Sequence, residues 1–115
     1  MSISRVDELA AELSKAIIES DEYKNFIRCR DEIQKNPQLY QAVNELRKHN
    51  FQLQNAEGVA DMYDEVVKIY DKYAYVRTNI VANQFLRAEI SVCRMIQDIQ
   101  RTLLEPMDFD VDFLD

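Results

Sequence analysis

The sequence predicts an all-α protein, and three observations lead to that prediction. Among its 115 residues there is only one glycine, Gly58, and there are only two prolines, Pro37 and Pro106. Sheets and turn-rich folds need more of both, because these residues build tight turns. Apolar residues also recur at alternating steps of three and four, which places them on one face of a helix. We expect about five helices, with long antiparallel C-terminal helices in a helical bundle or coiled-coil-like oligomer. Residues 1–106 form a single domain and residues 107–115 a tail.

Residues 4–19 and 20–36 are expected to form the first two helices. Ser4 and Ser20 stand shortly before acidic residues. That arrangement suits a helix start, because serine accepts from free backbone N–H groups and acids meet the positive end of the helix dipole. The apolar positions of these helices are Val6, Leu9, Leu13, Ala16, Ile17, Tyr23, Phe26, Ile27 and Ile33.

The next two helices are separated by proline and glycine. Pro37 disfavours helical geometry at Asn36 and fits the first turn of a third helix, which we expect to fade near residue 55. Gly58 then suits a helix end, because glycine tolerates the left-handed conformation of a C-cap. A fourth helix is predicted over residues 59–77. Its apolar seam consists of Val59, Met62, Val66, Ile69, Tyr73 and Val76.

Residues 79–104 predict the longest helix, with Asn79 as its cap. Two neighbouring rows of apolar residues give it a face that a small chain cannot easily cover. We therefore expect this face to meet helices from the same molecule and from another copy, as in a homo-oligomer. The candidates for core or interface positions are Val81, Phe85, Leu86, Ala88, Val92, Met95, Ile96, Ile99 and Leu103.

The tail alternates apolar residues with aspartates. Phe109, Val111 and Phe113 occupy every second position, the pattern of an extended segment. Pro106 stops the helix before it. Two interpretations remain open: a frayed acidic terminus, or a docking strip whose apolar residues enter a groove on a partner or sister subunit. The aspartates resemble the opening of a calcium loop, but the glycine and distal glutamate of such a loop are missing.

Charge and hydropathy exclude several classes of protein. The formal net charge is −7, and most of it lies at Glu105, Asp108, Asp110, Asp112 and Asp115. The remaining body is close to neutral and has no basic stripe, so we expect no direct nucleic-acid binding. The run Arg47-Lys48-His49 is read as a solvated helix face. No apolar stretch is long enough to span a bilayer and no signal peptide is recognisable, which favours a cytoplasmic location without membrane insertion.

Catalytic and metal-binding patterns are missing from the sequence. His49 is the only histidine and is expected on the surface. There is no glycine-rich phosphate loop and no pair of cysteines at metal spacing, so we expect neither an enzyme nor a cofactor. Cys29 and Cys93 lie among apolar residues, and both are predicted to be buried free thiols. A thiol-based sensor would need an exposed thiolate at Cys93.

Other polar and aromatic residues leave alternatives. Core packing explains the tyrosines better than a base-stacking platform does; they are Tyr63, Tyr70, Tyr73 and Tyr75. Arg87 and Glu89 flank Ala88, and either pairing with neighbouring helices or plain surface positions would explain them. The broad face of residues 79–104 also fits a helical chaperone or small-ligand carrier.

The order of three segments resembles the YlbF/YmcA family of small helical bacterial regulators. The main segment, residues 82–99, begins Ala-Asn-Gln-Phe-Leu-Arg-Ala-Glu, and residues 20–24 and 36–40 agree with it. The resemblance implies an all-helical, non-enzymatic oligomer, dimeric or larger. It also implies related YlbF-like proteins and the endoribonuclease RNase Y as partners, with effects on messenger-RNA maturation, competence, biofilm formation and sporulation.

The end of the chain departs from that family pattern. Members of the RNase Y-associated complex carry a cysteine-bearing C-terminal extension implicated in iron–sulfur binding, whereas this chain ends in an acidic strip. Cys29 and Cys93 alone cannot supply a four-cysteine cluster site. A shorter paralogue with a different role fits the sequence as well.

Overall fold

The computed structural model describes residues 4–54, 73–110 and 112–114. The helices are α1 (Arg5–Ile18), α2 (Asp21–Gln34), α3 (Pro37–Gln54), α5 (Ala74–Arg77), α6 (Ile80–Leu104) and the 3-10 helix η1 (Asp112–Leu114). No strand occurs in these ranges, so the predicted all-α class is confirmed. Of the predicted helix over residues 59–77, only the last turn is described, as α5. Tyr73 is described just before α5, whereas residues 59–72 of that prediction, with Tyr63 and Tyr70 among them, and Gly58 lie outside the described residues.

Side-chain caps fix the starts of the helices where the sequence predicts them. Ser4 and Ser20 accept from the backbone N–H groups of Asp7 at 3.1 Å and Tyr23 at 3.2 Å. Asn79 accepts from the N–H of Ala82 at 3.0 Å. These bonds satisfy N–H groups that have no partner within the first helical turn.

Asn36 caps α3 in addition to following the end of α2. The residue was expected only to end the second helix, but its side chain accepts from the N–H of Leu39 at 3.2 Å at the start of α3. Pro37 is the first residue of α3, as expected, because its missing N–H is not needed there.

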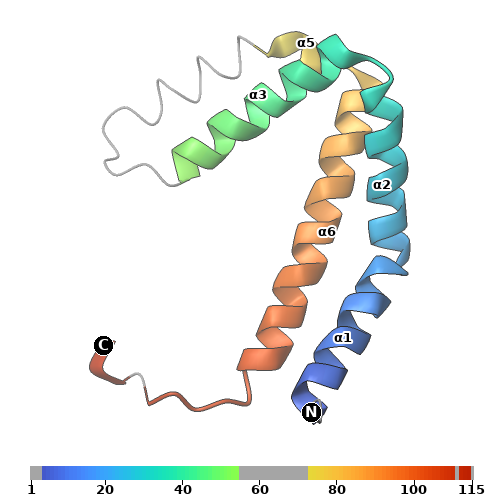
Figure 1. The fold of residues 1–115 in the computed structure, drawn as a ribbon. Helices are drawn as coiled ribbons and strands as arrows, with labels where there is room; N and C mark the ends of the chain where they lie inside the picture. The colour runs from blue at the N-terminus through green and yellow to red at the C-terminus, as the bar shows by residue number, and fades with distance from the viewer. Residues whose placement is uncertain (1–3, 55–72, 111, 115) are drawn as a thin grey trace.

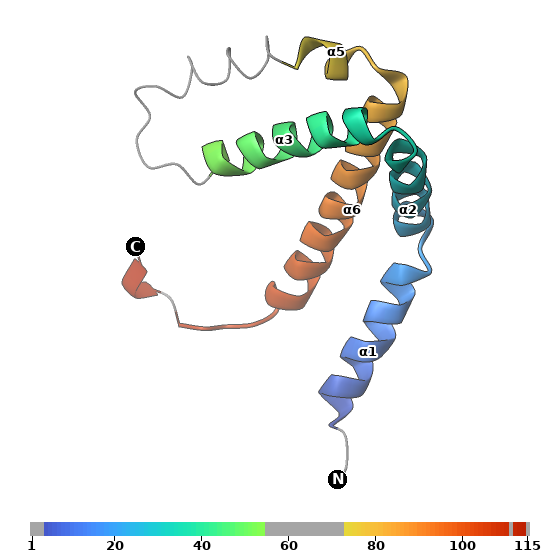
Figure 2. The ribbon, with the colours of Figure 1, turned by 45° about the horizontal axis from the view of Figure 1, so that its top comes forward.

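The helices form an arm and a branch (Figure 1). α1 and α2 follow one another along the arm, and α6 runs back beside α2 in the opposite direction. α3 leaves the end of α2 at an angle, so that it diverges from α6 toward its own C-terminal end (Figure 2). Toward the other end of the molecule α6 and α1 also separate. The two halves of α6 therefore have very different surroundings.

The buried core lies where α2, α3, α5 and the first half of α6 meet. Its members are Cys29, Ile33, Leu39, Ala42, Val43, Tyr73, Val76, Ala82, Phe85 and Ala88. Phe85 lies at its centre, with the ring of Phe26 edge-on at 5.5 Å and that of Tyr40 at 6.2 Å between centroids. Aromatic rings prefer such edge and tilted contacts because their faces are electron-rich and their edges electron-poor. α1 contributes no buried residue.

Arg47 links α3 to α6 at the edge of this core. Its guanidinium forms an ion pair with Glu89, donates to the side-chain oxygen of Asn44 at 2.9 Å, and lies 5.1 Å from the centre of the Phe85 ring. Of the two alternatives for Glu89, pairing with a neighbouring helix or a plain surface position, the structure shows the pairing. The expectation of a solvated face is wrong for Arg47, which is only partly exposed because α6 covers one side of it.

The tail bends, and the expected extended segment is not observed throughout. Residues 107–110 have no regular structure and residues 112–114 form η1. Asp110 has a φ of 52°, and its N–H donates to the carboxylate of Asp108 at 2.9 Å. Aspartate tolerates this left-handed conformation because its short side chain bonds to nearby backbone. The local turn replaces the straight path that alternation alone predicts.

Candidate interaction surface on α6

Burial along α6 changes abruptly at its midpoint. In the first half Phe85 and Ala88 are buried, and Val81 and Leu86 pack against the core. In the second half no residue is buried, although the apolar spacing continues. The half-buried residues there are Val92, Met95, Ile96 and Ile99, and Leu103 is 48% exposed. The nine candidates of residues 79–104 therefore divide between a core and an open surface.

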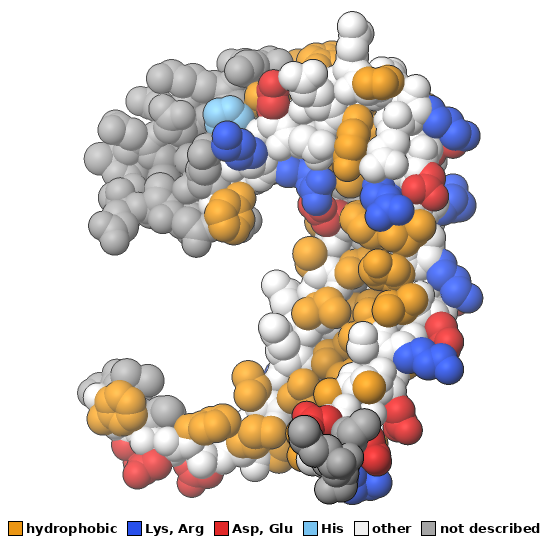
Figure 3. Space-filling view, in the orientation of Figure 1, with side chains coloured by type: hydrophobic (Ala, Val, Ile, Leu, Met, Phe, Trp, Pro, Cys, Tyr) orange, Lys and Arg blue, Asp and Glu red, His pale blue; other side chains and the backbone are white. Residues whose placement is uncertain are grey.

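α1 presents its own apolar residues at the same end of the molecule. Leu9 is 46% exposed and Leu13 is half-buried. A groove of about 590 Å³ runs between α1 and α6. Its lining residues are Leu13, Glu22, Ser91, Arg94, Met95, Asp98, Ile99, Thr102 and Leu103. We call the apolar side chains along both helices the apolar band; they are Leu9, Leu13, Val92, Met95, Ile96, Ile99 and Leu103. Figure 3 shows hydrophobic side chains gathered along this seam.

A second hollow, the α3–α6 cleft, opens on another side of α6. It has a volume of about 960 Å³. Its lining residues are Asn44, Arg47, Lys48, Phe51, Leu86, Glu89, Ile90, Cys93, Arg94 and Gln97. The cleft results from the divergence of α3 from α6 beyond the Arg47–Glu89 pair (Figure 2). The sequence did not predict this cleft, because the apolar periodicity of a helix does not determine its angle to another helix.

The two cysteines have opposite surroundings. Cys29 is buried, as predicted, with 3% of its surface exposed. The prediction of a buried thiol is wrong for Cys93, which is exposed in the α3–α6 cleft. Its apolar neighbours along α6 suggested burial, but the helix that would have to cover it, α3, has already turned away. Burial therefore does not shield the Cys93 thiol from solvent.

The tail candidates lie away from the helices. Phe109 is 64% exposed and Phe113 is 78% exposed. Val111 lies outside the described residues. In Figure 3 an orange patch and red aspartate side chains share this end of the chain. Neither ring is buried by other described residues.

Catalytic chemistry finds little support in the geometry. His49 is half-buried, not fully on the surface as expected, with its ring 6.1 Å from that of Tyr73. Tyr73 is a core residue, as core packing predicted, and its hydroxyl donates to Glu45 at 3.1 Å. Across the described ranges no group of three His, Cys, Asp or Glu side chains could hold a metal ion. None of the described helices is long and apolar enough to cross a membrane.

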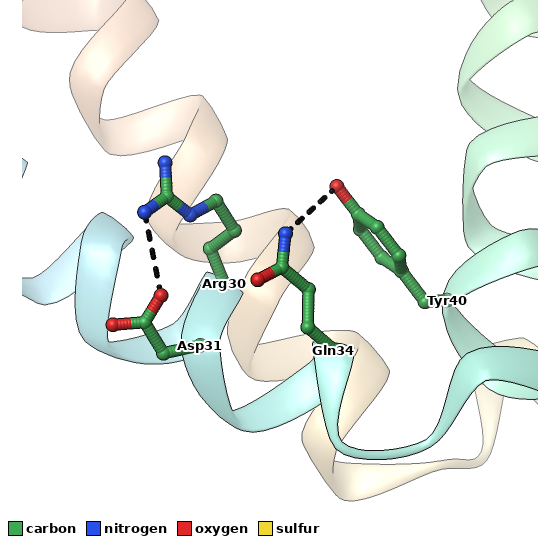
Figure 4. A network of polar contacts seen from close by, with 4 residues as sticks. All are labelled: Arg30, Asp31, Gln34 and Tyr40. Carbon is green, nitrogen blue, oxygen red and sulfur yellow. Dashed lines mark hydrogen bonds and ion pairs between the residues drawn. The ribbon is translucent and has the colours of Figure 1, made fainter.

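A small polar network joins α2 to α3 beside the core (Figure 4). The side-chain amide of Gln34 donates to the hydroxyl of Tyr40 at 3.4 Å, and Arg30 pairs with Asp31 at 3.3 Å. The Gln34 bond, followed by one from Asn44, lowers the pKa of Tyr40 below 10.0, because donors stabilise the phenolate. The bond between Gln34 and Tyr40 links α2 to α3 at the corner between them.

Comparison with known proteins agrees with this helical architecture. Residues 6–108 match the family model described as "Control of competence regulator ComK, YlbF/YmcA". The chain belongs to the YlbF/YmcA family. The match runs from the second residue of α1 to beyond the end of α6, so the expected resemblance is confirmed, and with it membership of a family of regulators. It ends at residue 108, before Phe109 and Phe113.

Relatives among curated proteins carry uninformative names. A UPF0342 protein of Caldicellulosiruptor bescii is 26% identical over 106 residues, which are 90% of this chain and 89% of the relative. A UPF0342 protein of Desulfitobacterium hafniense is 27% identical over 100 residues, 85% of this chain and 81% of the relative. No solved structure matches the chain. The comparisons thus support membership of a family described by a regulatory role.

Proposed function

We propose that this protein is a non-catalytic regulatory adaptor that self-associates through the apolar band and binds further proteins through its other faces. One observation carries the proposal. The apolar seam of α6 continues for several turns beyond the core, and nothing in the described chain buries it. Monomeric proteins seldom leave such a continuous apolar surface open to water.

The energetics favour a partner helix over solvent. Each Å² of apolar surface removed from water stabilises a complex by roughly 25 cal/mol, and stable interfaces bury about 800 Å² on each partner. Apolar side chains repeat along both α1 and α6, so a helix of a partner could pack along the whole length of the apolar band. A second copy presenting the same band would produce a two-fold interface.

The family suggests what the adaptor regulates. Its description refers to control of the competence regulator ComK. By resemblance, the proposed partners are related YlbF-like proteins and RNase Y, in the cytoplasm, with messenger-RNA processing, competence, biofilm formation or sporulation as the process affected. An adaptor needs no active site for this role, only surfaces that place other proteins together.

The self-association is tested by introducing a charge into the band. Light scattering with size-exclusion chromatography should show that the wild type is a dimer or larger and that Ile99→Glu shifts it toward monomer. Gln100→Glu is the matched control, because it adds the same charge at the adjacent, exposed position of α6. A wild type that stays monomeric at all concentrations would overturn the proposal, as would equal behaviour of the two variants.

The choice of partner needs a separate experiment. Pull-down of the tagged wild type from its native cells should recover YlbF-like proteins and RNase Y, and Ile99→Glu should recover less of any partner that requires the oligomer. Absence of both kinds of protein would remove the family-derived partner. Native mass spectrometry that shows a retained small molecule would favour the alternative, a ligand carrier using the same face.

A further inference from the structure

The α3–α6 cleft has the features of a receptor for a short acidic and aromatic segment. Its apolar surface comes from Phe51, Leu86 and Ile90, of which Phe51 is 67% and Ile90 49% exposed. Two exposed cations, Lys48 and Arg94, lie along its rim. Among the described residues that line it, Glu89 is the only carboxylate, and it is already paired with Arg47. The cleft therefore combines exposed apolar side chains with two exposed cations, and its described carboxylate is already in an ion pair.

The tail has the complementary composition. Phe109 and Phe113 are the most exposed of its described apolar residues, and Asp108, Asp110 and Asp112 stand between and beside them. A segment of this kind binds by placing its rings in an apolar groove while its carboxylates meet cations at the rim. Among the described residues, the α3–α6 cleft offers apolar surface together with the two cations Lys48 and Arg94. The α1–α6 groove, which Arg94 also lines, includes the carboxylates of Glu22 and Asp98 in its walls.

The tail does not lie in the cleft of its own chain, since no described tail residue is among the residues that line it. Arg94 lies ten residues before Leu104, which at about 1.5 Å per residue places it roughly 15 Å back along α6. To return there the chain would have to reverse around Pro106. It instead leaves α6 sideways, on the side toward which α3 also projects, and turns at Asp110 through the bond to Asp108. It ends apart from α3 and α6 in both views (Figures 1 and 2).

We infer that the tail of one copy docks in the α3–α6 cleft of a second copy of this chain. Phe109 and Phe113 enter the apolar part of the cleft, and the aspartates face Lys48 and Arg94. The inference rests on the proposed self-association and specifies a contact beyond the apolar band. In a two-fold dimer the exchange is reciprocal, so each copy gives one tail and receives another.

Cys93 lines the cleft and provides a reporter for the test. One variant carries Asp112→Cys together with Cys93→Ser, so it has a thiol in the tail and none in the cleft. It is mixed with wild-type chain, given time to exchange, and oxidised mildly. We expect a covalent dimer in which mass spectrometry finds the introduced tail thiol joined to Cys93. Cys29 is buried and remains in every variant.

Two controls make the result specific. Asp31→Cys with Cys93→Ser places a thiol at an exposed position of α2 and should give little covalent dimer with wild type. A chain with Asp112→Cys and its own Cys93 tests the alternative occupant. Should that chain form mainly an internal disulfide, while the mixture gives no dimer, the tail folds into its own cleft and the second-copy inference is wrong.

Charge and ring substitutions test the chemistry of docking. Lys48→Glu should slow the tail-to-Cys93 crosslink several-fold, and Lys24→Glu, the same change at an exposed position of α2, should not. Phe109→Ser with Phe113→Ser should reduce the crosslink further, because the rings supply the buried surface. Unchanged crosslinking in Lys48→Glu and in the double serine variant would overturn the inference.

The oligomeric mass separates this failure from failure of the proposed function. If the wild type is dimeric in light scattering but gives no tail-to-Cys93 crosslink, the docking inference is wrong and the adaptor proposal is unaffected. A wild type that is monomeric at every concentration would remove both.

Discussion

The two halves of α6 carry the same apolar spacing, yet only one half has a core. In the first half Phe85 and Ala88 are buried by α2, α3 and α5. In the second half Met95 and Ile99 remain half-buried and Leu103 is exposed, because α1 diverges and brings no buried residue of its own. The difference teaches that helical periodicity marks a face that must be covered, without saying whether the same chain covers it.

The largest expected effect follows from truncating the centre of the core. Phe85→Ala should lower the free energy of unfolding by about 3–5 kcal/mol, because a buried ring is replaced by a cavity. Met95→Ala, on the same helix but outside the core, should cost about 1 kcal/mol or less. Urea unfolding at protein concentrations below association measures both. Equal losses would contradict the division of α6 into two halves.

A smaller effect distinguishes the helix caps of the two regions. Asn79→Ala removes the cap of α6 beside the core and should lower the free energy of global unfolding by about 1 kcal/mol. Ser4→Ala removes the cap of α1. It should scarcely change global unfolding, since α1 has no buried residue to lose, but should speed hydrogen exchange in the first turns of that helix. Equal shifts in global unfolding would show that α1 folds together with the core.

Ion pairs provide a third comparison between the regions. A double-mutant cycle with Arg47→Met and Glu89→Gln should give a coupling energy of about 0.5–1 kcal/mol, because α3 and α6 partly shield the pair. The same cycle for Arg101→Met and Asp98→Asn in the second half should give a value close to zero, since both side chains are about 70% exposed. A larger coupling at Arg101 would require that surface to be covered.

The smallest expected effect is a pH dependence at Tyr40. Its pKa in the folded protein is below 10.0, chiefly because Gln34 donates to the phenolate. Between that lowered pKa and about 10 the unfolded chain binds more protons at this residue, so its contribution to stability rises with pH there and is complete above that window. Ultraviolet titration of wild type minus Tyr40→Phe should show this early ionisation. Gln34→Leu should move it back toward 10; no movement would exclude Gln34 as the main cause.

Much of the local structure could be predicted from the sequence, because its causes are local. Ser4, Ser20 and Asn79 cap the helices that follow them, and Pro37 begins one, as their chemistry requires. The all-helical fold and the family could be recognised in the same way. The bend at Asp110 was missed because two local preferences compete there, and the bond to Asp108 prevails over apolar alternation.

The candidate surfaces were only partly predictable, since they depend on angles between helices. The nine apolar candidates of α6 were identified together, but nothing in their spacing distinguished Phe85 from Leu103. Cys93 was predicted to be buried because its neighbours are apolar, and the divergence of α3 leaves it exposed. Arg47 was assigned to a solvated face, although a carboxylate next to Ala88 on α6 was a usable hint that it had a partner.

The sequence by itself determined where each helix begins, which side of it is apolar, and that the acidic charge gathers in the tail. These properties follow from backbone hydrogen bonding, side-chain periodicity and composition, all of which act over a few residues. Only the tertiary structure decided that the first half of α6 is a core and the second half a surface, and that a positively edged cleft lies beside Cys93. Those outcomes depend on how α1 and α3 diverge from α6, and contacts between residues far apart in the chain set those angles.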